Sequence, residues 1–224
     1  MINSGVCYSG TIARFDLRNS WAIEKHLLQR KEEMTSTDSS NRPYVSRSGT
    51  KLAAALDAFK VKPAGWVCAD LGCNVGGFVD CLLQHGAEKV YAIDTGYGTL
   101  AYTLRKDPRV VVMERTNAMH VALPELMDLV TIDVAWTPQH HILPNALRLL
   151  KPDGRIITLI KPHYEADQSQ LREGVLEPES AREVLDQICK HITKMGAKIG
   201  GIIESPITGN KGNVEFLALL TIDR

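Results

Sequence analysis

The sequence of 224 residues lacks an excess of either charge, because its 26 Lys and Arg residues equal its 26 Asp and Glu residues. The net charge therefore gives no reason to expect a nucleic-acid partner, and any such argument must come from local residues. Long apolar runs are also missing, since no stretch approaches the roughly 20 apolar residues of a membrane-spanning helix. The first residues, MINSGVCYSGTIARFDLR, contain no apolar core of a secretory signal. We expect a cytoplasmic protein with no membrane contact.

Cysteine is scarce, and its spacing excludes the common metal patterns. The five cysteines form no CxxC pair and no Cys/His ligand set, which favours small buried thiols in a reducing compartment. His140 and His141 are the other candidate ligands, but adjacent side chains point in different directions and no further ligand stands at suitable spacing. We therefore predict no metal site. The cysteines are Cys7, Cys68, Cys73, Cys81 and Cys189.

A change in composition near residue 43 predicts the domain organisation. Residues 32–43 (EEMTSTDSSNRP) are polar and show no apolar periodicity, which is typical of a linker. We expect an N-terminal arm over residues 1–43, of unassigned role, and one domain over residues 44–224. The segment from Ser48 predicts an amphipathic helix with Ser48 as its N-cap, because apolar residues follow at helical spacing.

Short apolar runs alternate with helical patterns along the rest of the chain. Strands that are apolar on both faces and separated by helices predict a mostly parallel sheet covered on both sides. Only SPITGNKGN separates the last two runs, and a parallel crossover needs a dozen or more residues, so the final strand should return antiparallel. We predict an α/β, Rossmann-like fold with a seven-stranded sheet, an antiparallel C-terminal strand and helices on both faces. The runs lie at 66–70, 90–94, 110–113, 129–133, 155–160, 198–203 and 214–222.

The turn after the first run carries the pattern of a nucleotide site. In open α/β sheets ligands bind beyond the carboxyl ends of the strands, beside a glycine-rich first turn. Here the turn reads DLGCNVGGF over residues 70–78, and Asn74 stands where the dinucleotide fingerprint requires glycine. Asp70 ends the first run and is placed to face the amino-acid part of a cofactor, while Asp94 ends the second and suits ribose hydroxyls. The pattern favours S-adenosylmethionine over a nicotinamide dinucleotide.

Two lysines and two carboxylates are candidates for the chemistry. Lys161 follows the buried run RIITLI at the rim of the predicted crevice, and Asp133 ends LVTID in the same way. Glu215 interrupts an apolar run, where a carboxylate needs a partner that a lysine at the neighbouring strand end would supply. Lys51 starts the preceding helix. These four could form a structural ion network, but the set favours catalysis, with Lys161 accepting a hydroxyl proton and the carboxylates orienting it.

Further segments make the sequence resemble a known family. YVSRSGTKLAAALDAF, CADLGCNVGGFVDCLLQHGAEKVYAIDTGYGTLAYTLRKDPRVVVMERTNAM, LVTIDVAW, LIKPHYE and SPITGNKGNVEFLALL stand in order at the expected separations, across about four-fifths of the chain. The sequence resembles the FtsJ-like ribosomal RNA 2′-O-ribose methyltransferases, and within them the hemolysin A (TlyA-type) branch. The resemblance implies S-adenosylmethionine as cofactor, a ribose 2′-hydroxyl of RNA as acceptor, and ribosomal RNA or a ribosomal subunit as partner.

The resemblance also implies roles for individual residues. The family's Lys-Asp-Lys-Glu tetrad maps onto Lys51, Asp133, Lys161 and Glu215, with Lys161 as the general base. Cofactor contacts are implied for Gly72, Gly76, Gly77, Phe78, Asp94 and Asn117, with Asp133 near the methyl group. Asn117 comes from the resemblance alone, whereas Asp70 is a candidate because of its position in the first turn.

Several departures from the family lie on the substrate side. TlyA-type proteins usually begin with a small S4-type RNA-binding domain, which residues 1–43 do not resemble, and IDVAW stands where the family has IDVSF. After KPHYE, a basic glycine-rich loop is replaced by DQSQLREGVLEPES. Two alternatives stay open: a methyltransferase with a small-molecule or protein substrate, and a SAM-binding regulatory protein. A basic rim could be an RNA path or a merely solvated surface; its residues are Arg42, Arg47, Lys51, Arg105, Lys106, Arg109 and Arg115.

Overall fold

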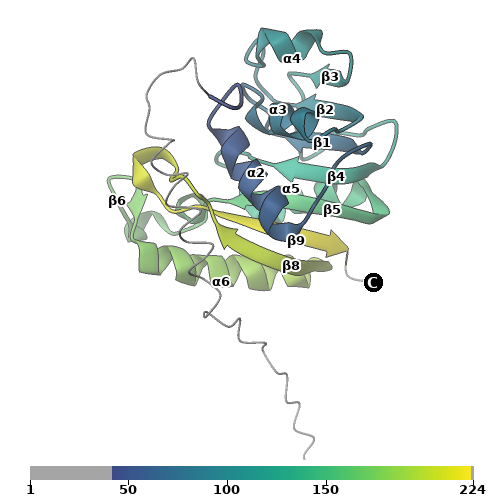
Figure 1. The fold of residues 1–224 in the computed structure, drawn as a ribbon. Coiled ribbons are helices and arrows are strands. Elements are labelled where there is room, and N and C mark those ends of the chain that lie inside the picture. The colour runs from purple at the N-terminus through teal and green to yellow at the C-terminus, as the bar shows by residue number, and fades with distance from the viewer. Residues whose placement is uncertain (1–41, 223–224) are drawn as a thin grey trace, which may run out of the picture. The chain divides into compact units, whose positions relative to one another are not determined.

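Figure 1 shows the fold in a computed structural model, which describes residues 42–222. The expected N-terminal arm, except for residues 42 and 43, lies outside the described residues, as does Cys7. Within residues 42–222 no helix is long and apolar enough to cross a membrane.

The core is one seven-stranded sheet in the order β3-β2-β1-β4-β5-β9-β8. Strands β1 to β5 pair in parallel, and β9 runs antiparallel to both of its neighbours. The predicted sheet and its reversed C-terminal strand are therefore confirmed. The strands are β1 (Val67–Leu71), β2 (Lys89–Ile93), β3 (Val110–Met113), β4 (Met127–Ile132), β5 (Leu150–Ile160), β8 (Ala197–Glu204) and β9 (Phe216–Ile222).

Helices cover both faces of the sheet. One apolar layer joins α2 (Ser48–Phe59), α3 (Gly77–Gln84) and α4 (Tyr102–Lys106) to one face, and a second joins α5 (Gln139–Arg148) and α6 (Pro178–Lys194) to the other. Alternate residues of each strand point into the two layers, as Cys68 and Ala69 do, which explains why the strand sequences are apolar on both faces. The layers hold the strand ends rigid, and the site is built on those ends.

Two local features differ from the sequence prediction. Arg47, not Ser48, is the N-cap of α2, and it makes no side-chain capping bond, so the predicted serine cap is wrong. The Ser48 hydroxyl instead bonds the Ser46 hydroxyl at 2.8 Å. A small hairpin of β6 (Leu171–Arg172) and β7 (Val175–Leu176) was not predicted. Short 3-10 turns are η3 (Pro162–Tyr164), η4 (Gln168–Gln170) and η5 (Asn210–Gly212).

Candidate active site

A cavity of about 290 Å³ lies at the carboxyl ends of the parallel strands. It is lined by the turns that follow β1, β2, β3 and β4, which is where ligands bind in open α/β sheets. Four of the predicted cofactor residues line it: Gly72, Asp94, Asn117 and Asp133. The other lining residues were not among the predicted cofactor contacts; they are Asn74, Thr95, Thr116, Ala118, Met119, Val134, Ala135, Trp136, Thr137 and Ile142.

The first turn is shaped by a requirement for glycine. Gly72 has a φ of +90°, and a Cβ atom there would lie 2.6 Å from the backbone oxygen of Asp133. Asp94 fixes the tip of the same turn, because its carboxylate accepts hydrogen bonds from the backbone N–H of Asn74 at 2.8 Å and of Gly96 at 2.7 Å. Each carboxylate oxygen keeps a further lone pair, so Asp94 suits the hydroxyls of a ribose. The glycine turn and Asp94 therefore fit a nucleoside cofactor.

The remaining predicted cofactor residues do not line the cavity. Asp70 is buried, accepts a hydrogen bond from the Thr131 hydroxyl at 2.7 Å, and has no partner for its second oxygen. Burial raises the pKa of Asp70 to about 8. Side chains at Gly76 and Gly77 would collide with α4 and with the start of α2, respectively, and Phe78 is part of the core. These glycines allow close packing of α3.

The four candidate catalytic residues form two separate ion pairs. Lys161 Nζ lies 2.6 Å from the Asp133 carboxylate and donates a hydrogen bond to the Val134 carbonyl at 3.0 Å. Lys51 forms a hydrogen-bonded ion pair with Glu215, and both side chains are buried. The first pair borders the cavity through Asp133, which is one of its lining residues.

This pairing corrects one prediction about Glu215. The expected partner was a lysine at the neighbouring strand end. The strand register does bring Lys161 near Glu215, because it pairs Ile160, the residue before Lys161, with Phe216, the residue after Glu215. The partner of Glu215 is nevertheless Lys51 of α2, and Glu215 lies just before β9 rather than within it. Asp133 alone pairs with Lys161. The buried carboxylate thus ties α2 to the sheet.

His163 is a buried residue near both pairs that the sequence did not identify. It is the middle residue of η3, which begins directly after Lys161. His163 is only 8% exposed, and its Nδ1 has no hydrogen-bond partner. Burial and the neighbouring charges of Lys161 and Lys51 lower the pKa of His163 to about 4. A neutral imidazole therefore stands beside the two lysines at neutral pH. The motif KPHYE contains this histidine, but nothing in its spacing indicated burial.

An exposed aromatic pair lies at the same end of the cavity. Trp136 is 80% exposed, has a φ of +61°, and its ring centroid lies 4.7 Å from that of Tyr164. Lys161 Nζ is 5.8 Å from the Tyr164 ring centroid. A left-handed conformation is unusual for a bulky residue and holds the indole at the surface. The pair places an exposed indole beside a tyrosine ring that lies close to Lys161.

His140 and His141 do not form part of the site chemistry. Their ring centroids lie 4.0 Å apart, so the expectation that these neighbours point apart is wrong. Among residues 42–222 no group of three or more His, Cys, Asp or Glu side chains is arranged to hold a metal.

The fold is Rossmann-like, and solved SAM-dependent methyltransferases of 17–18% identity share it. The family model for FtsJ-like methyltransferases matches residues 44–221, so the chain belongs to the FtsJ-like methyltransferase family. This confirms the predicted family, fold class, enzyme class and cofactor, S-adenosylmethionine. The glycine turn and Asp94 are the part of the cavity that fits this nucleoside cofactor.

Three related proteins show how much of the chain is shared. The 16S/23S rRNA (cytidine-2′-O)-methyltransferase TlyA of Mycobacterium tuberculosis is 39% identical over 193 residues, which cover 84% of this chain and 72% of TlyA. YqxC of Bacillus subtilis, a candidate rRNA methyltransferase, is 40% identical over 78% of this chain, but the chain spans only 64% of YqxC. A solved Lactococcus lactis protein, a hemolysin candidate, has a TM-score of 0.76 at 38% identity, covering 79% of this chain and 88% of that one.

Proposed function

We propose that this protein transfers the methyl group of S-adenosylmethionine to a ribose 2′-hydroxyl of ribosomal RNA, with Lys161 as the general base. The single observation that carries the proposal is the Lys161–Asp133 pair at 2.6 Å on the border of the cofactor cavity. The similarity to TlyA, a 16S/23S rRNA (cytidine-2′-O)-methyltransferase, supports the choice of acceptor. We assign the catalytic domain to residues 44–224, the partner to rRNA or a ribosomal subunit, and the location to the cytoplasm.

The arrangement accounts for the residues that the reaction needs. S-adenosylmethionine, when bound, supplies an electrophilic methyl sulfonium. Asp133 and the Val134 carbonyl hold Lys161 Nζ in place, and its lone pair accepts the hydroxyl proton once Lys161 has lost its own proton to solvent. The acceptor oxygen then forms its bond to the methyl carbon as the carbon–sulfur bond breaks. Because methyl transfer removes the positive charge of the sulfonium, correct positioning of the two reactants supplies most of the rate enhancement.

The aromatic pair supports a nucleotide as acceptor. Aromatic side chains recognise unpaired RNA bases by stacking on them. The Trp136 and Tyr164 rings lie 4.7 Å apart and next to Lys161, so a base stacked on Trp136 would place its ribose close to the proposed base. A small-molecule acceptor would not require so exposed a surface.

The reaction is tested by incubating the full chain with tritiated SAM and ribosomal subunits, or separately with deproteinised rRNA, and digesting the product to nucleosides. Label in a 2′-O-methylated nucleoside is the expected result. If SAM binds and no RNA is labelled, the acceptor is not RNA, and the two alternatives of a different substrate or a regulatory role take precedence.

The role of Lys161 is tested with the variant Lys161→Ala. We expect transfer to fall by about 10²- to 10⁴-fold, the usual contribution of a general base, while the Kd for SAM stays within about twofold of wild type. Lys198→Ala is the matched control, because Lys198 is an exposed lysine at the amino end of β8, whereas Lys161 follows the carboxyl end of β5. Wild-type turnover by Lys161→Ala would remove Lys161 from the mechanism.

A further inference from the structure

Two exposed tyrosines near α4 each carry a cation over the ring. Tyr97 is 71% exposed and Tyr102 is 72% exposed, which makes them, with Trp136, the most exposed large apolar side chains among the described residues. The Arg115 guanidinium lies 4.3 Å from the Tyr97 ring centroid, and Lys106 Nζ lies 5.4 Å from that of Tyr102. We call these four residues the tyrosine ledge.

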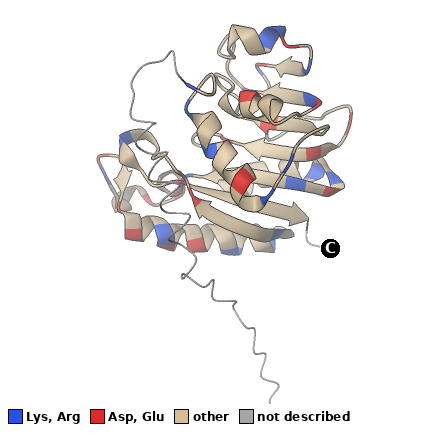
Figure 2. Ribbon diagram, viewed as in Figure 1, with Lys and Arg blue, Asp and Glu red and all other residues tan. Residues whose placement is uncertain are grey.

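The two cations of the tyrosine ledge are not neutralised by nearby carboxylates. Glu114 is paired with Arg105 and also accepts the backbone N–H of Gly98, and Asp107 is paired with Arg109 at 2.6 Å. In the part of the chain from residue 42 to 222, neither Lys106 nor Arg115 has an ion-pair partner. Both are therefore available to an anionic ligand. Figure 2 colours the basic residues of α4 blue on the ribbon.

The tyrosine ledge is attached to the wall of the cofactor cavity. The backbone N–H of Arg115 bonds the Gly96 carbonyl at 3.1 Å, and that of Thr116 bonds the Asp94 carbonyl at 2.9 Å. Asp94 and Thr116 line the cavity, so the loops that carry the ledge also form the wall beside the cofactor. Because β3 and β2 lie three to four strand spacings from β5, the ledge is roughly 15–20 Å from Lys161 along the sheet edge.

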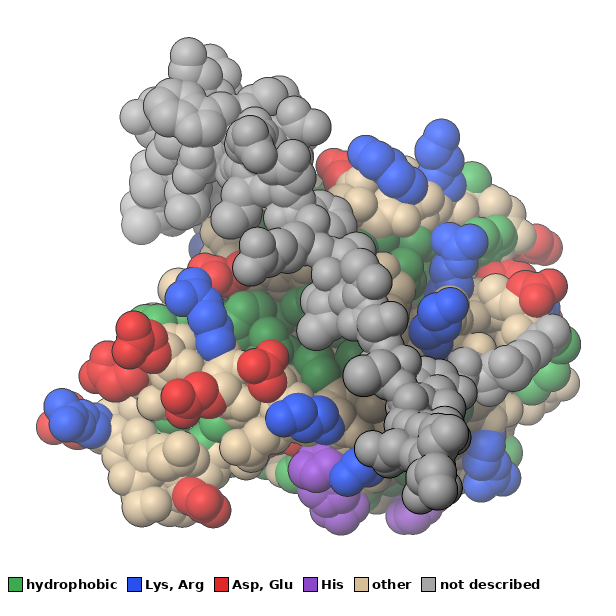
Figure 3. Space-filling model, turned by 90° about the horizontal axis from the view of Figure 1, so that it is seen from below, with side chains coloured by type: hydrophobic (Ala, Val, Ile, Leu, Met, Phe, Trp, Pro, Cys, Tyr) green, Lys and Arg blue, Asp and Glu red, His purple; other side chains and the backbone are tan. Residues whose placement is uncertain are grey.

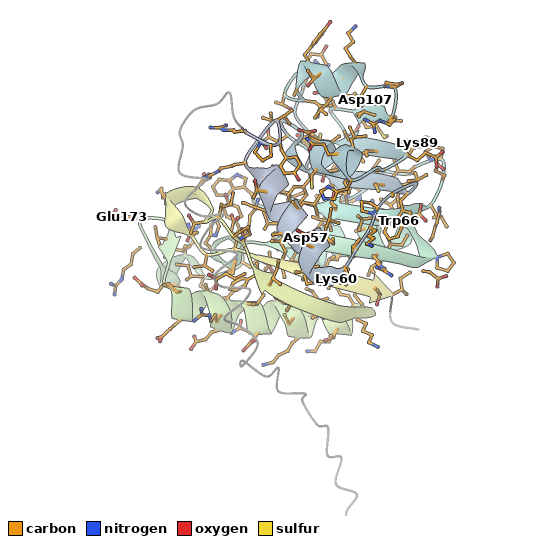
Figure 4. The ribbon with its side chains drawn as sticks, in the orientation of Figure 1. Asp57, Lys60, Trp66, Lys89, Asp107 and Glu173 are labelled. Carbon is orange, nitrogen blue, oxygen red and sulfur yellow. The ribbon has the colours of Figure 1, made fainter. Side chains whose placement is uncertain are left out.

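The other side of the acceptor position is acidic. Residues 165–183, which include the β6–β7 hairpin and the start of α6, contain six carboxylates and two arginines. Figure 3 shows acidic side chains gathered over this end, and the exposed ones are Asp167, Glu173, Glu177, Glu179 and Glu183. In Figure 4, Glu173 at this end and Asp107 beside α4 mark opposite ends of the described domain. A polyanion placed at Lys161 is repelled from the hairpin and attracted toward the ledge.

We propose that the tyrosine ledge binds single-stranded RNA next to the acceptor nucleotide, with bases stacked on Tyr97 and Tyr102 and phosphates at Lys106 and Arg115. Surfaces that bind single strands combine exposed aromatic rings with cations in this way. The strand leaves the acceptor site across β4 and β1, over the cofactor cavity, and away from the hairpin. This inference rests on the proposed function, because it places the same RNA.

The test measures RNA binding by the full chain, independently of methyl transfer. The probe is a fluorescein-labelled, mixed-sequence, single-stranded RNA of 12 nucleotides, followed by anisotropy from 50 to 250 mM KCl. The variants are Tyr97→Ala with Tyr102→Ala, and Lys106→Gln with Arg115→Gln. The matched controls are Tyr97→Phe with Tyr102→Phe, which keeps both rings, and Lys62→Gln with Lys198→Gln, which removes the same charge near the amino ends of the strands. Trp66, just before β1, and Lys89, at the start of β2, mark this end in Figure 4.

We expect the alanine pair to weaken binding about 10- to 100-fold, as loss of base stacking does. The glutamine pair should also reduce the slope of log K against log salt by about 1.4, since each phosphate contact contributes roughly 0.7 with single strands. Both controls should stay within twofold of wild type. In the transfer assay, the same changes should raise the KM for RNA and leave kcat at saturating RNA unchanged.

Three results overturn the inference in distinguishable ways. If wild type methylates rRNA and the alanine and glutamine pairs bind RNA as tightly as their controls, the tyrosine ledge does not bind RNA and the proposed function stands. If wild type binds no RNA and labels none, both fail together. If sedimentation velocity shows that the alanine pair converts a dimer to a monomer with unchanged RNA affinity, the ledge joins copies of this chain and does not bind RNA.

Discussion

The two lysines of the active site have different surroundings. Lys161 is partly exposed and borders the cavity through Asp133, whereas Lys51 and Glu215 are both buried, at 6% and 3% exposure. A buried ion pair contributes little net stability, but an unpaired buried charge is costly. Lys51 and Glu215 also join α2 to the start of β9, two elements 164 residues apart in sequence. The pair is therefore a positioning device for the elements around Lys161.

The variant Glu215→Gln should be strongly destabilised, because it leaves Lys51 buried without its counter-charge. We expect the free energy of unfolding to fall by about 3–5 kcal/mol, measured by urea denaturation. The double variant Lys51→Met with Glu215→Leu removes both charges and should recover most of this loss. If Glu215→Gln unfolds like wild type, the pair is not closed in solution and the assignment of Lys51 as its partner fails.

The sequence predicts which site residues come together only where those residues lie at the ends of recognisable strands. Asp133 and Lys161 each follow an apolar run, and adjacent parallel strands bring such positions together, so their pairing follows from the pattern. Lys51 pairs across the α2 layer, and this contact depends on how α2 crosses the sheet. His163 is buried because the 3-10 turn η3, which follows Lys161, directs it inward. A turn of three residues is too short to produce a periodic pattern in the sequence.

At the scale of elements, Asn213 fastens the β6–β7 hairpin to the loop before β9. Its side-chain oxygen accepts the Leu176 N–H at 3.0 Å, and its amide donates to the carbonyls of Gly174 and Asn210, each at 3.0 Å. Asn213 is only 2% exposed. The buried amide of Asn213 thus pairs with three backbone groups. Since Asn213 is two positions before Glu215 in the sequence, it joins the hairpin to the segment that carries Glu215.

Replacing Asn213 with Ala should release the hairpin without unfolding the sheet. Three backbone groups lose their partner, so hydrogen exchange at residues 171–176 should speed up by about 10- to 100-fold, while amides of β1 and β4 keep their protection. Asn210→Ala is the matched control, because Asn210 takes part in this contact only through its backbone. Unchanged exchange in the hairpin would show that other contacts hold it.

The strands of the main sheet could be predicted and the hairpin could not, for a physical reason. The strands β1, β2 and β4 are buried on both faces along most of their length, so their sequences are largely apolar. The hairpin has two residues in each strand, joined by Glu173 and Gly174, both with positive φ. It is held by contacts with other parts of the chain, among them the hydrogen bonds of Asn213 and Lys211. A segment that short has no pattern of its own.

At the scale of the whole molecule, a net charge of zero conceals two ends of opposite sign. Residues 95–115 carry four basic and two acidic side chains, whereas residues 165–183 carry two basic and six acidic ones. The counts are readable from the sequence, but the separation of the two segments depends on the fold. The strand order places β3 and β2 on one side of β5, and Figure 1 shows β6 of the hairpin on the other side of the domain. The family resemblance indicated the fold and cofactor, and the fold then located the charges.

Two buried titratable groups make opposite contributions to how stability depends on pH. Asp70 has a pKa raised to about 8 in the folded chain from its ordinary 3.8, so the folded state holds a proton that the unfolded state releases. Its contribution is fully present below pH 3.8 and is lost as pH rises to 8. His163 has a pKa lowered to about 4 from 6.5, so its contribution is present above pH 6.5 and is lost as pH falls to 4.

Between about pH 4 and 6.5 the two contributions change with pH in opposite directions, so their effects on the free energy of unfolding cancel. Above pH 6.5 only the contribution of Asp70 still changes. We therefore expect Asp70→Asn to remove a decline in the free energy of unfolding, on the order of 2 kcal/mol between pH 6.5 and 8. The same variant should show a rise between pH 4 and 6.5, because the effect of His163 is then unopposed. Urea denaturation at half-unit pH steps, with His163→Gln as the reciprocal variant, measures both windows. If the difference between Asp70→Asn and wild type stays constant from pH 6.5 to 8, Asp70 is ionised in the folded protein, and its unpartnered oxygen has found a cation or water that stabilises the charge.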